Sequence, residues 1–131
     1  MLDDNPAPSV PLYNWDTIPS FDYGGITVRG FRGSNVAIGY SHLYPGTEMK
    51  PPHTHDIEQI FMILQGRVKL HVGDQIHDCR PGSIVLIPPH VEHWVEPPSA
   101  EDGVAINLDI FSPIREDFLK LTAYQTEQFA S

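Results

Sequence analysis

Two histidines and a glutamine near the middle of the chain have the types and the spacing of metal ligands. His53 and His55 are two residues apart in an extended segment, and a strand points residues i and i+2 to the same face. Gln59 follows four residues later, where a short turn can return its amide oxygen to the same point. A metal also needs a ligand from another strand, and His93 is the candidate to supply it. The spacing therefore predicts a metal centre held by these four side chains.

Imidazole nitrogen is a ligand that many divalent transition metals accept. Zinc, nickel, iron, cobalt and manganese all suit a site made mainly of histidines, because selectivity follows geometry and availability more than intrinsic affinity. We expect one such divalent ion, and the residue types leave its identity open. The competing interpretation is that these histidines are only polar residues that line the inside of a barrel.

The elements that must position these residues are short strands. Apolar and polar residues alternate in eight segments separated by turn residues: 26–28, 36–44, 58–66, 67–72, 75–79, 83–87, 93–95 and 104–111. Within 58–66, Gln59, Phe61 and Ile63 share the face that carries the candidate ligand. The 13 prolines and 10 glycines count against a helical bundle. The pattern predicts an all-β fold, either a small antiparallel barrel or a double-sheet jelly roll.

A short helix is expected after the last strand. Ser112 can cap it with Pro113 in its first turn, and the acidic pair Glu116–Asp117 complements the positive end of the helix dipole. Apolar residues then recur at helical spacing, at Ile114, Phe118, Leu121 and Tyr124. We expect one face of this helix to pack on the strands.

The length, charge and composition of the whole chain limit its domain organisation and its partners. Its 131 residues suffice for one domain, which we place at 13–131 after a flexible arm at 1–12 that is rich in Pro, Asn and Asp. The net charge of −9 excludes nucleic acid and anionic membranes as partners. The chain start lacks the basic and apolar pattern of a secretory signal, and no apolar stretch could span a membrane, so we expect a cytoplasmic protein. Cys79 is the only cysteine, which fits a reducing compartment, and we interpret it as a small buried hydrophobe.

The residues from 46 to 93 resemble the two motifs of the cupin superfamily. The first motif places a Gly before an HxH pair, then an acid or amide, then another Gly; it matches Gly46, His53, His55, Gln59 and Gly66. The second motif runs from a Gly through a Pro to a His, and it matches Gly82, Pro88 and His93. The chain has His90 and Pro97 where the second motif usually has Gly and Asn, and neither is a ligand position. The resemblance implies a small cupin jelly-roll β-barrel with a bound metal.

The family usually has Glu at the ligand position that Gln59 occupies here. A neutral amide donates less charge than a carboxylate, so His53, His55, His93 and Gln59 would leave a divalent ion more electrophilic, which suits Lewis-acid chemistry. Glu58 immediately precedes Gln59 and is the alternative ligand if the turn is tighter. Both assignments stay open at this point.

A second group of residues lies near the C-terminus, in the segment LDIFSPIREDF. It resembles the DxFxPxRxDF signature of small KdgF-type cupins, which linearise unsaturated uronates. The resemblance implies catalytic roles for Asp109, Phe111 and Arg115. A carboxylate can relay a proton during ring opening and ketonisation, and a guanidinium can hold the substrate carboxylate by two hydrogen bonds. The alternative for Asp109 and Arg115 is a structural ion pair that pins the helix to the barrel, and Arg29 and Arg32 are weaker candidates for the substrate-binding cation.

Four further histidines have weaker claims on the site. His71 and His77 flank a hairpin and are expected on a solvated face. His42 could line a pocket or be a satisfied interior residue, and His90 has a modest claim to touch substrate. Trp94 alternates with His93 and should therefore point away from the metal.

Three classes of function remain. The leading hypothesis is a metal-dependent isomerase that opens the ring of a small hydroxylated acid, such as a 4,5-unsaturated uronate, and ketonises it. The alternatives are a mononuclear iron dioxygenase and a non-catalytic cupin that binds a sugar or a metal. By resemblance to small cupins we also expect a homodimer, with Ile84, Leu86, Trp94 and the N-terminal arm covering the interface.

Overall fold

Short strands build most of the protein, as the alternating sequence predicts. The computed structural model describes residues 10–125, which contain nine strands, one α-helix and one 3-10 helix. Their bounds are β1 Phe21–Asp22, β2 Ile26–Arg32, β3 Ala37–Leu43, β4 Gln59–Gln65, β5 Val68–Val72, β6 Gln75–Cys79, β7 Ile84–Ile87, β8 His93–Glu96, β9 Ala105–Phe111, α1 Asp117–Leu121 and η1 Ala123–Gln125. All eight expected strands are present, and β1 is an additional strand of two residues. Most of the arm expected at 1–12 lies outside the described residues.

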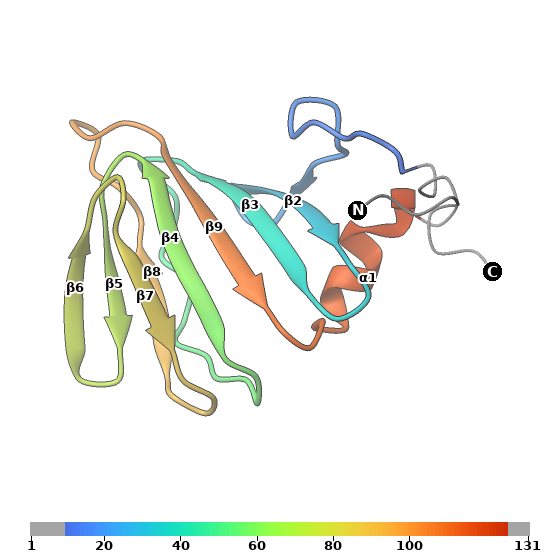
Figure 1. Cartoon of the computed structure of the whole chain (residues 1–131). Coiled ribbons are helices and arrows are strands. Elements are labelled where there is room, and N and C mark those ends of the chain that lie inside the picture. The colour runs from blue at the N-terminus through green and yellow to red at the C-terminus, as the bar shows by residue number, and fades with distance from the viewer. Residues whose placement is uncertain (1–9, 126–131) are drawn as a thin grey trace, which may run out of the picture.

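The strands form two sheets, which is the predicted jelly roll without a continuously hydrogen-bonded closed barrel. Six strands pair in the order β1-β2-β3-β9-β4-β7, and three pair in the order β6-β5-β8. Figure 1 shows β5 and β6 at one end of the molecule and α1 at the other end, where it contacts β2. In the part of the chain that the structure describes, neither helix has the length and apolar character needed to cross a membrane.

The strand alternation decides which side chains fill the space between the sheets. Gln59, Phe61 and Ile63 of β4 are all buried, as expected. The main core cluster consists of Leu43, Phe61, Ile63, Val68, Leu70, Cys79, Ile87 and Ala105. Cys79 is 1% exposed, in agreement with its interpretation as a buried hydrophobe. A second cluster of Ala37, Phe111, Phe118 and Leu121 lies under α1.

The C-terminal helix is shorter than predicted, and its predicted start at Ser112 is wrong. α1 begins at Asp117, with Glu116 as the N-cap residue, and ends at Leu121. The Ser112 hydroxyl donates a hydrogen bond to the Asn35 carbonyl at 2.9 Å, so it ties the end of β9 to another loop and does not cap a helix. The predicted packing of one face is nevertheless correct, because Phe118 and Leu121 are buried.

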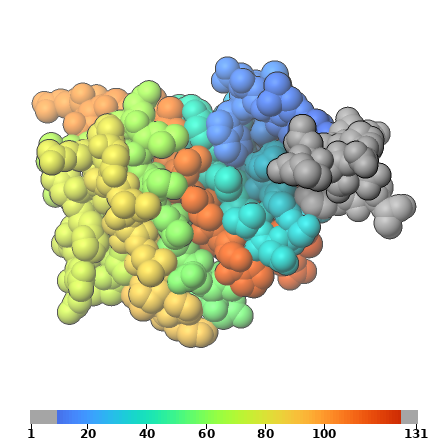
Figure 2. Space-filling view, viewed as in Figure 1, coloured from blue at the N-terminus to red at the C-terminus, as the bar shows by residue number. Residues whose placement is uncertain are grey.

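The outward face of β4 and β7 is apolar. Ile84 and Leu86 are 63% and 55% exposed, and they pair in register with Met62 and Ile60 of β4. Figure 2 shows β4 in green beside β9 in orange on the surface turned to the viewer. Trp94 does not share this face, because it belongs to β8 of the other sheet, so the three residues expected at a dimer interface do not form one patch. Pairing of two copies stays a prediction, now confined to the β4–β7 face.

Leu86→Asp tests this pairing. A two-fold dimer buries the same patch on both copies, so the substitution would bury two carboxylates at the interface. The cost of desolvating them should shift the protein to a monomer. Size-exclusion chromatography with light scattering measures the change. Ile76→Asp is the matched control, because Ile76 is 62% exposed on β6 of the other sheet. A wild-type monomer, or equal effects of the two variants, would contradict pairing through β4–β7.

Gly66 occupies a position in the β4–β5 turn that only glycine fits. Its φ is +78°, a conformation that side-chain-bearing residues rarely adopt. A Cβ built there would stand 2.7 Å from the Cα of Ala105, which is backbone and cannot move aside cheaply. Gly66 is also the glycine that ends the first cupin motif, and the close approach of Ala105 explains why this motif position is a glycine.

Gly66→Ala should lower the free energy of unfolding by about 2–4 kcal/mol, from about 1–2 kcal/mol of left-handed backbone strain and about 1–3 kcal/mol of overpacking. Gly82→Ala is the control, because Gly82 has a φ of +94° and a Cβ there would meet no atom within 4 Å. It should lose only the backbone part. Urea denaturation of both variants measures the difference, and equal losses would show that the contact with Ala105 does not matter.

Candidate metal centre

A backbone bridge brings the HxH pair next to His93. The amide of His53 donates to the carbonyl of His93 at 3.2 Å, and the amide of His93 donates back to His53 at 3.0 Å. The amide of His90 donates to the carbonyl of His55 at 2.8 Å, which holds the same loop at a second point. The ligand nitrogens of His53, His55 and His93 lie within 4.8 Å of one another. The structure therefore groups the three histidines that the spacing predicts.

Hydrogen bonds to backbone carbonyls fix the protonation of two of these rings. Nδ1 of His55 lies 2.7 Å from the carbonyl of Ile57, and Nδ1 of His93 lies 2.9 Å from the carbonyl of Val91. A carbonyl only accepts, so each Nδ1 carries a proton, and in the neutral form of the ring the lone pair is on Nε2. Nε2 of His93 is buried without a hydrogen-bond partner. A buried acceptor without a partner is costly, and a metal ion would satisfy it.

Gln59 presents its amide oxygen to the same group. Its Nε2 donates to Oδ1 of Asp109 at 2.6 Å, and its Oε1 lies 3.1 Å from Nε2 of His55. An ionised carboxylate only accepts, so the amide nitrogen faces Asp109 and the oxygen faces the histidines. The lone pairs on Gln59 and His55 then converge, and a shared cation stabilises that arrangement. Glu58 is exposed and outside the histidine group, so Gln59 is the better placed of the two candidates.

The local environment keeps the imidazoles in the form that binds metal. Burial lowers the pKa of His93 to about 4, and the nearby His53, His55 and Arg115 lower it further, against a hydrogen bond to Val91 that raises it. The pKa of His53 is also lowered, first by burial and then by the charges of His55 and Arg115. Both rings are therefore neutral at neutral pH, as metal ligation requires. The donor set of three imidazole nitrogens and one amide oxygen fits a divalent transition metal ion.

Asp109 lies beside this centre on the inward face of β9. Its Oδ1 accepts from Gln59, and its Oδ2 accepts from the amide of Asn107 at 3.0 Å. Burial raises the pKa of Asp109 to about 6, against the hydrogen bonds from Gln59 and Asn107, which lower it. Gln59 thus joins the histidine group to a carboxylate whose two oxygens are both held in place.

Phe111 and Arg115 border the same centre. The Phe111 ring is 2% exposed and packs edge-on against His55, with a centroid separation of 5.8 Å. The guanidinium carbon of Arg115 lies 5.0 Å above the centre of that ring, and Nε of Arg115 pairs with Asp117 at 3.3 Å. The alternative of a structural Asp109–Arg115 ion pair is wrong, because Arg115 pairs with Asp117 and Asp109 is held by two amides.

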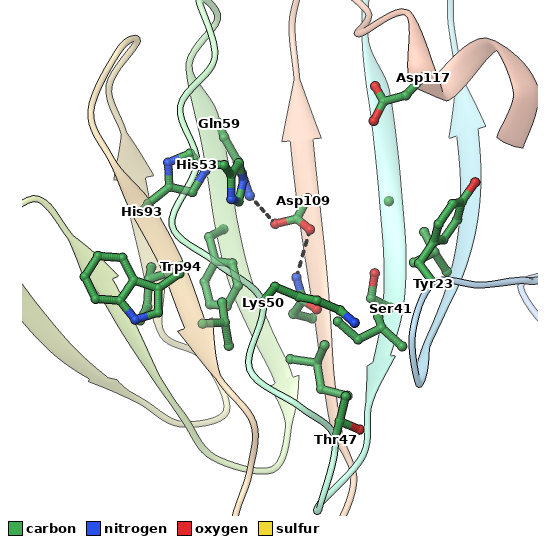
Figure 3. A pocket seen from close by; sticks show the side chains of 18 of the residues that line it. Tyr23, Ser41, Thr47, Lys50, His53, Gln59, His93, Trp94, Asp109 and Asp117 are labelled. Atoms are coloured by element: carbon green, nitrogen blue, oxygen red, sulfur yellow. Dashed lines mark hydrogen bonds between the residues drawn. The ribbon is translucent and has the colours of Figure 1, made fainter.

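Except for His55, these residues line one cavity of about 430 Å³, which lies between the sheets. Figure 3 shows His53, His93 and Gln59 on one side of it, with Asp109 beside Gln59. A volume of this size suits a small-molecule ligand. The lining is mainly apolar, with a few polar groups that converge, and such a cavity is the usual form of a ligand-binding site.

The two weaker cation candidates do not line the cavity. Arg29 of β2 pairs in register with Tyr40 of β3. The adjacent pair, Val28 and Ser41, lines the cavity, so Arg29 is on the outward face. The backbone of Arg32 is hydrogen-bonded to the side chain of Gln125 of η1. Of the arginines in the described residues, Arg115 is the one that reaches the cavity.

The other histidines also lie outside the cavity lining. His42 packs edge-on against Tyr40 and stacks with Tyr44 on the outer side of β3, so it does not line the pocket. His90 is exposed on the turn before β8. His71 is half-buried, stacks on Trp94 at 4.3 Å and bonds to Glu96 at 2.7 Å, which corrects its expected place on a solvated face.

Several polar residues of the cavity have no place in the sequence-based prediction. Asn107 and Ser41 line it. Asn107 is two residues from Asp109 on β9, and Ser41 is two residues from Gly39 on the neighbouring β3, so each pair shares a face of its strand. This spacing was the available signal. Tyr23 and Lys50 also line it, but they come from turns, where no periodicity indicates direction.

Comparison with solved structures shows proteins with the same fold. An RmlC-like cupin from Shewanella frigidimarina is 25% identical with a TM-score of 0.73, over 84% of this chain and 96% of that chain. KdgF from Halomonas sp. is 21% identical with a TM-score of 0.74, over 83% of this chain and 100% of that chain. TT1209 from Thermus thermophilus is 20% identical with a TM-score of 0.65, over 78% and 96%. Among curated proteins no match is found.

The family assignment comes from the sequence itself. The cupin domain model matches residues 39–111, which is more than half of the chain and includes every predicted metal ligand. The two-sheet fold and the three grouped histidines agree with this match. The chain therefore belongs to the cupin domain family.

Proposed function

We propose that this protein is a metal-dependent enzyme of the isomerase type. It opens the ring of a small hydroxylated acid, such as a 4,5-unsaturated uronate, and ketonises the product. The observation that carries the proposal is the amide of Gln59, whose oxygen faces the histidine group and whose nitrogen donates to Asp109. A metal ion held by the histidine group would lie next to this carboxylate, which supports a reaction that combines a Lewis acid with a proton carrier.

His53, His55, Gln59 and His93 would hold one divalent transition metal ion. When bound, such an ion polarises the oxygen atoms of a sugar and stabilises negative charge that develops on them. The reaction itself involves no net oxidation, because opening a cyclic hemiacetal and converting an enol to a ketone only move protons. The metal therefore needs no change of oxidation state, and several metals could serve.

Asp109 is the proposed proton carrier. Both of its oxygens are fixed by amide donors, from Gln59 and Asn107, so the carboxylate has one orientation towards the cavity. It can accept a proton from a sugar hydroxyl and return it to carbon, which is the net change in ketonisation. Neither neighbouring amide can take the proton in its place.

Arg115 and Phe111 are the proposed positioning groups that touch the substrate. The guanidinium is held by the Phe111 ring on one face and by Asp117 at Nε. It has five N–H donors, so one carboxylate partner leaves others for substrate oxygens. The Phe111 ring contacts both this guanidinium and the His55 ring.

The choice of substrate class rests on two likenesses. The DxFxPxRxDF segment resembles the signature of KdgF-type cupins, and KdgF from Halomonas sp. has the same fold. At 21% identity, the second likeness supports the fold alone. Unsaturated uronates are therefore the first compounds to assay.

Metal binding is tested with protein purified without a chelating tag. A metal present at about 100 times its Kd should raise the free energy of unfolding by about 2.7 kcal/mol. His93→Ala should lose most of this gain, with a metal affinity at least about 100-fold lower. His77→Ala on β6, outside the cavity lining, is the matched control. Full metal stabilisation of His93→Ala would contradict the ligand assignment.

Catalysis is tested by following the loss of the enol absorbance of a 4,5-unsaturated uronate. Asp109→Asn should reduce kcat by about 10²–10⁴-fold, because the amide cannot relay the proton. Arg115→Lys should mainly raise KM. Arg115→Lys should keep the wild-type melting temperature, whereas Asp109→Asn should lower it because one amide donor loses its acceptor. Asp78→Asn, which changes an exposed carboxylate paired with Arg67, is the control and should keep full turnover.

The alternative functions give different results in the same assay. Oxygen uptake by iron-loaded protein, with no anaerobic turnover, would replace the isomerase with a dioxygenase. Binding of uronates without any spectral change, under saturating metal, would identify a non-catalytic binding protein. An Asp109→Asn variant that unfolds more easily but turns over normally would assign a structural role to Asp109.

A further inference from the structure

A second cation lines the cavity. Lys50 lies in the segment between β3 and β4, three residues before His53, and it is half-buried. Figure 3 shows its side chain lying across the cavity in front of β9, with its ammonium group directed towards the side where Ser41 and Tyr23 lie. Its Nζ donates a hydrogen bond to the carbonyl of Gly24 at 2.9 Å. Lys50 therefore joins the HxH loop to the β1–β2 turn.

The charge on Lys50 is less compensated than the charge on Arg115. Arg115 pairs with Asp117 at 3.3 Å. Within residues 10–125, none of the ion pairs includes Lys50, whose hydrogen-bond partner is the neutral carbonyl of Gly24. An ammonium group has three donors, and this bond uses one of them. Lys50 thus brings an ammonium group outside these ion pairs into a cavity that the carboxylates of Glu48, Asp109 and Asp117 also line.

The β1–β2 turn is shaped to hold this ammonium group. Gly24 has a φ of +64°, and a Cβ at this residue would stand 2.0 Å from Nζ of Lys50. The absence of a side chain at Gly24 therefore lets the ammonium group reach the backbone carbonyl. Tyr23 and Thr47 line the cavity nearby, and their hydroxyl groups can bond to a hydroxylated ligand.

The geometry points to Lys50 as an anion subsite that selects acidic ligands over neutral ones. The acid group of the ligand binds to the ammonium group of Lys50. Lys50 therefore takes over the contact with the ligand carboxylate that the sequence suggests for Arg115. Arg115 is left to donate hydrogen bonds to ligand oxygens next to Asp109. The choice of a sugar acid as ligand rests on the proposed function, whereas the preference for negative charge rests on Lys50.

The test compares one sugar acid with its neutral counterpart. Calorimetry of metal-loaded protein would measure the Kd of galacturonate and of galactose for the wild type and for Lys50→Met. The wild type should prefer the acid by about 10- to 100-fold, the range of a hydrogen bond between charged groups. Lys50→Met should bring the ratio close to one without weakening galactose binding. Lys50→Arg should keep the preference.

Matched variants separate this subsite from the rest of the molecule. Lys69→Met removes a lysine that is exposed on β5, and it should leave the ratio unchanged. An acid preference that survives in Lys50→Met and is lost in Arg115→Lys would overturn the inference and assign the carboxylate to Arg115. A wild type that binds both sugars equally, or neither, would also overturn it.

The inference and the proposed function can fail separately. If the acid preference depends on Lys50 but unsaturated uronates are not converted, the subsite stands and the isomerase does not. If uronates are converted and Lys50→Met has the wild-type KM, the isomerase stands and the subsite does not. Melting curves of Lys50→Met and Lys50→Arg check that loss of the bond to Gly24 has not unfolded the loop.

Discussion

The backbone bridge between His53 and His93 is the contact on which the rest of the site depends. Its two hydrogen bonds fasten the loop before β4 to the first residue of β8, which belongs to the other sheet. Without it, the position of the HxH pair relative to His93 would depend on the hydrogen bond from His90 to His55. With it, three imidazoles converge, and one of them keeps a buried nitrogen without a partner. The fold thus maintains a polar group that is costly unless a cation is bound.

Gln59 links the three histidines to the carboxylate of Asp109. Its amide has two different ends, and the carboxylate of Asp109 decides which end faces the histidines. A Glu at this position would place two carboxylates next to each other, and their repulsion would raise the pKa of one of them. The neutral amide avoids that repulsion and leaves more positive charge on a bound ion. The choice of Gln over Glu therefore affects both the metal and the proton carrier.

Much of this arrangement could be predicted from the sequence, because period-two alternation fixes which residues face inward. Gln59 with Phe61, and Asp109 with Phe111, follow this rule. Predictions failed where a side chain had more than one possible partner. The Ser112 hydroxyl bonds to Asn35 in place of a helix end, and Arg115 pairs with Asp117 in place of Asp109.

Turn residues were the hardest to predict. Lys50 and Tyr23 come from turns, and their direction depends on the tertiary packing of two loops. The stacking of Trp94 on His71 likewise requires knowledge of the β5–β8 pairing. The alternation within a strand can be read from a single sequence, whereas the pairing of one strand with another cannot.

The most direct test of the central claim is anomalous X-ray diffraction from crystals of the metal-loaded protein. We predict one anomalous peak, about 2.0–2.2 Å from the imidazole nitrogens of His53, His55 and His93. The amide oxygen of Gln59 should complete the ligand set from the protein. A peak at any other group of residues, or coordination by Glu58 with Gln59 turned away, would contradict the account.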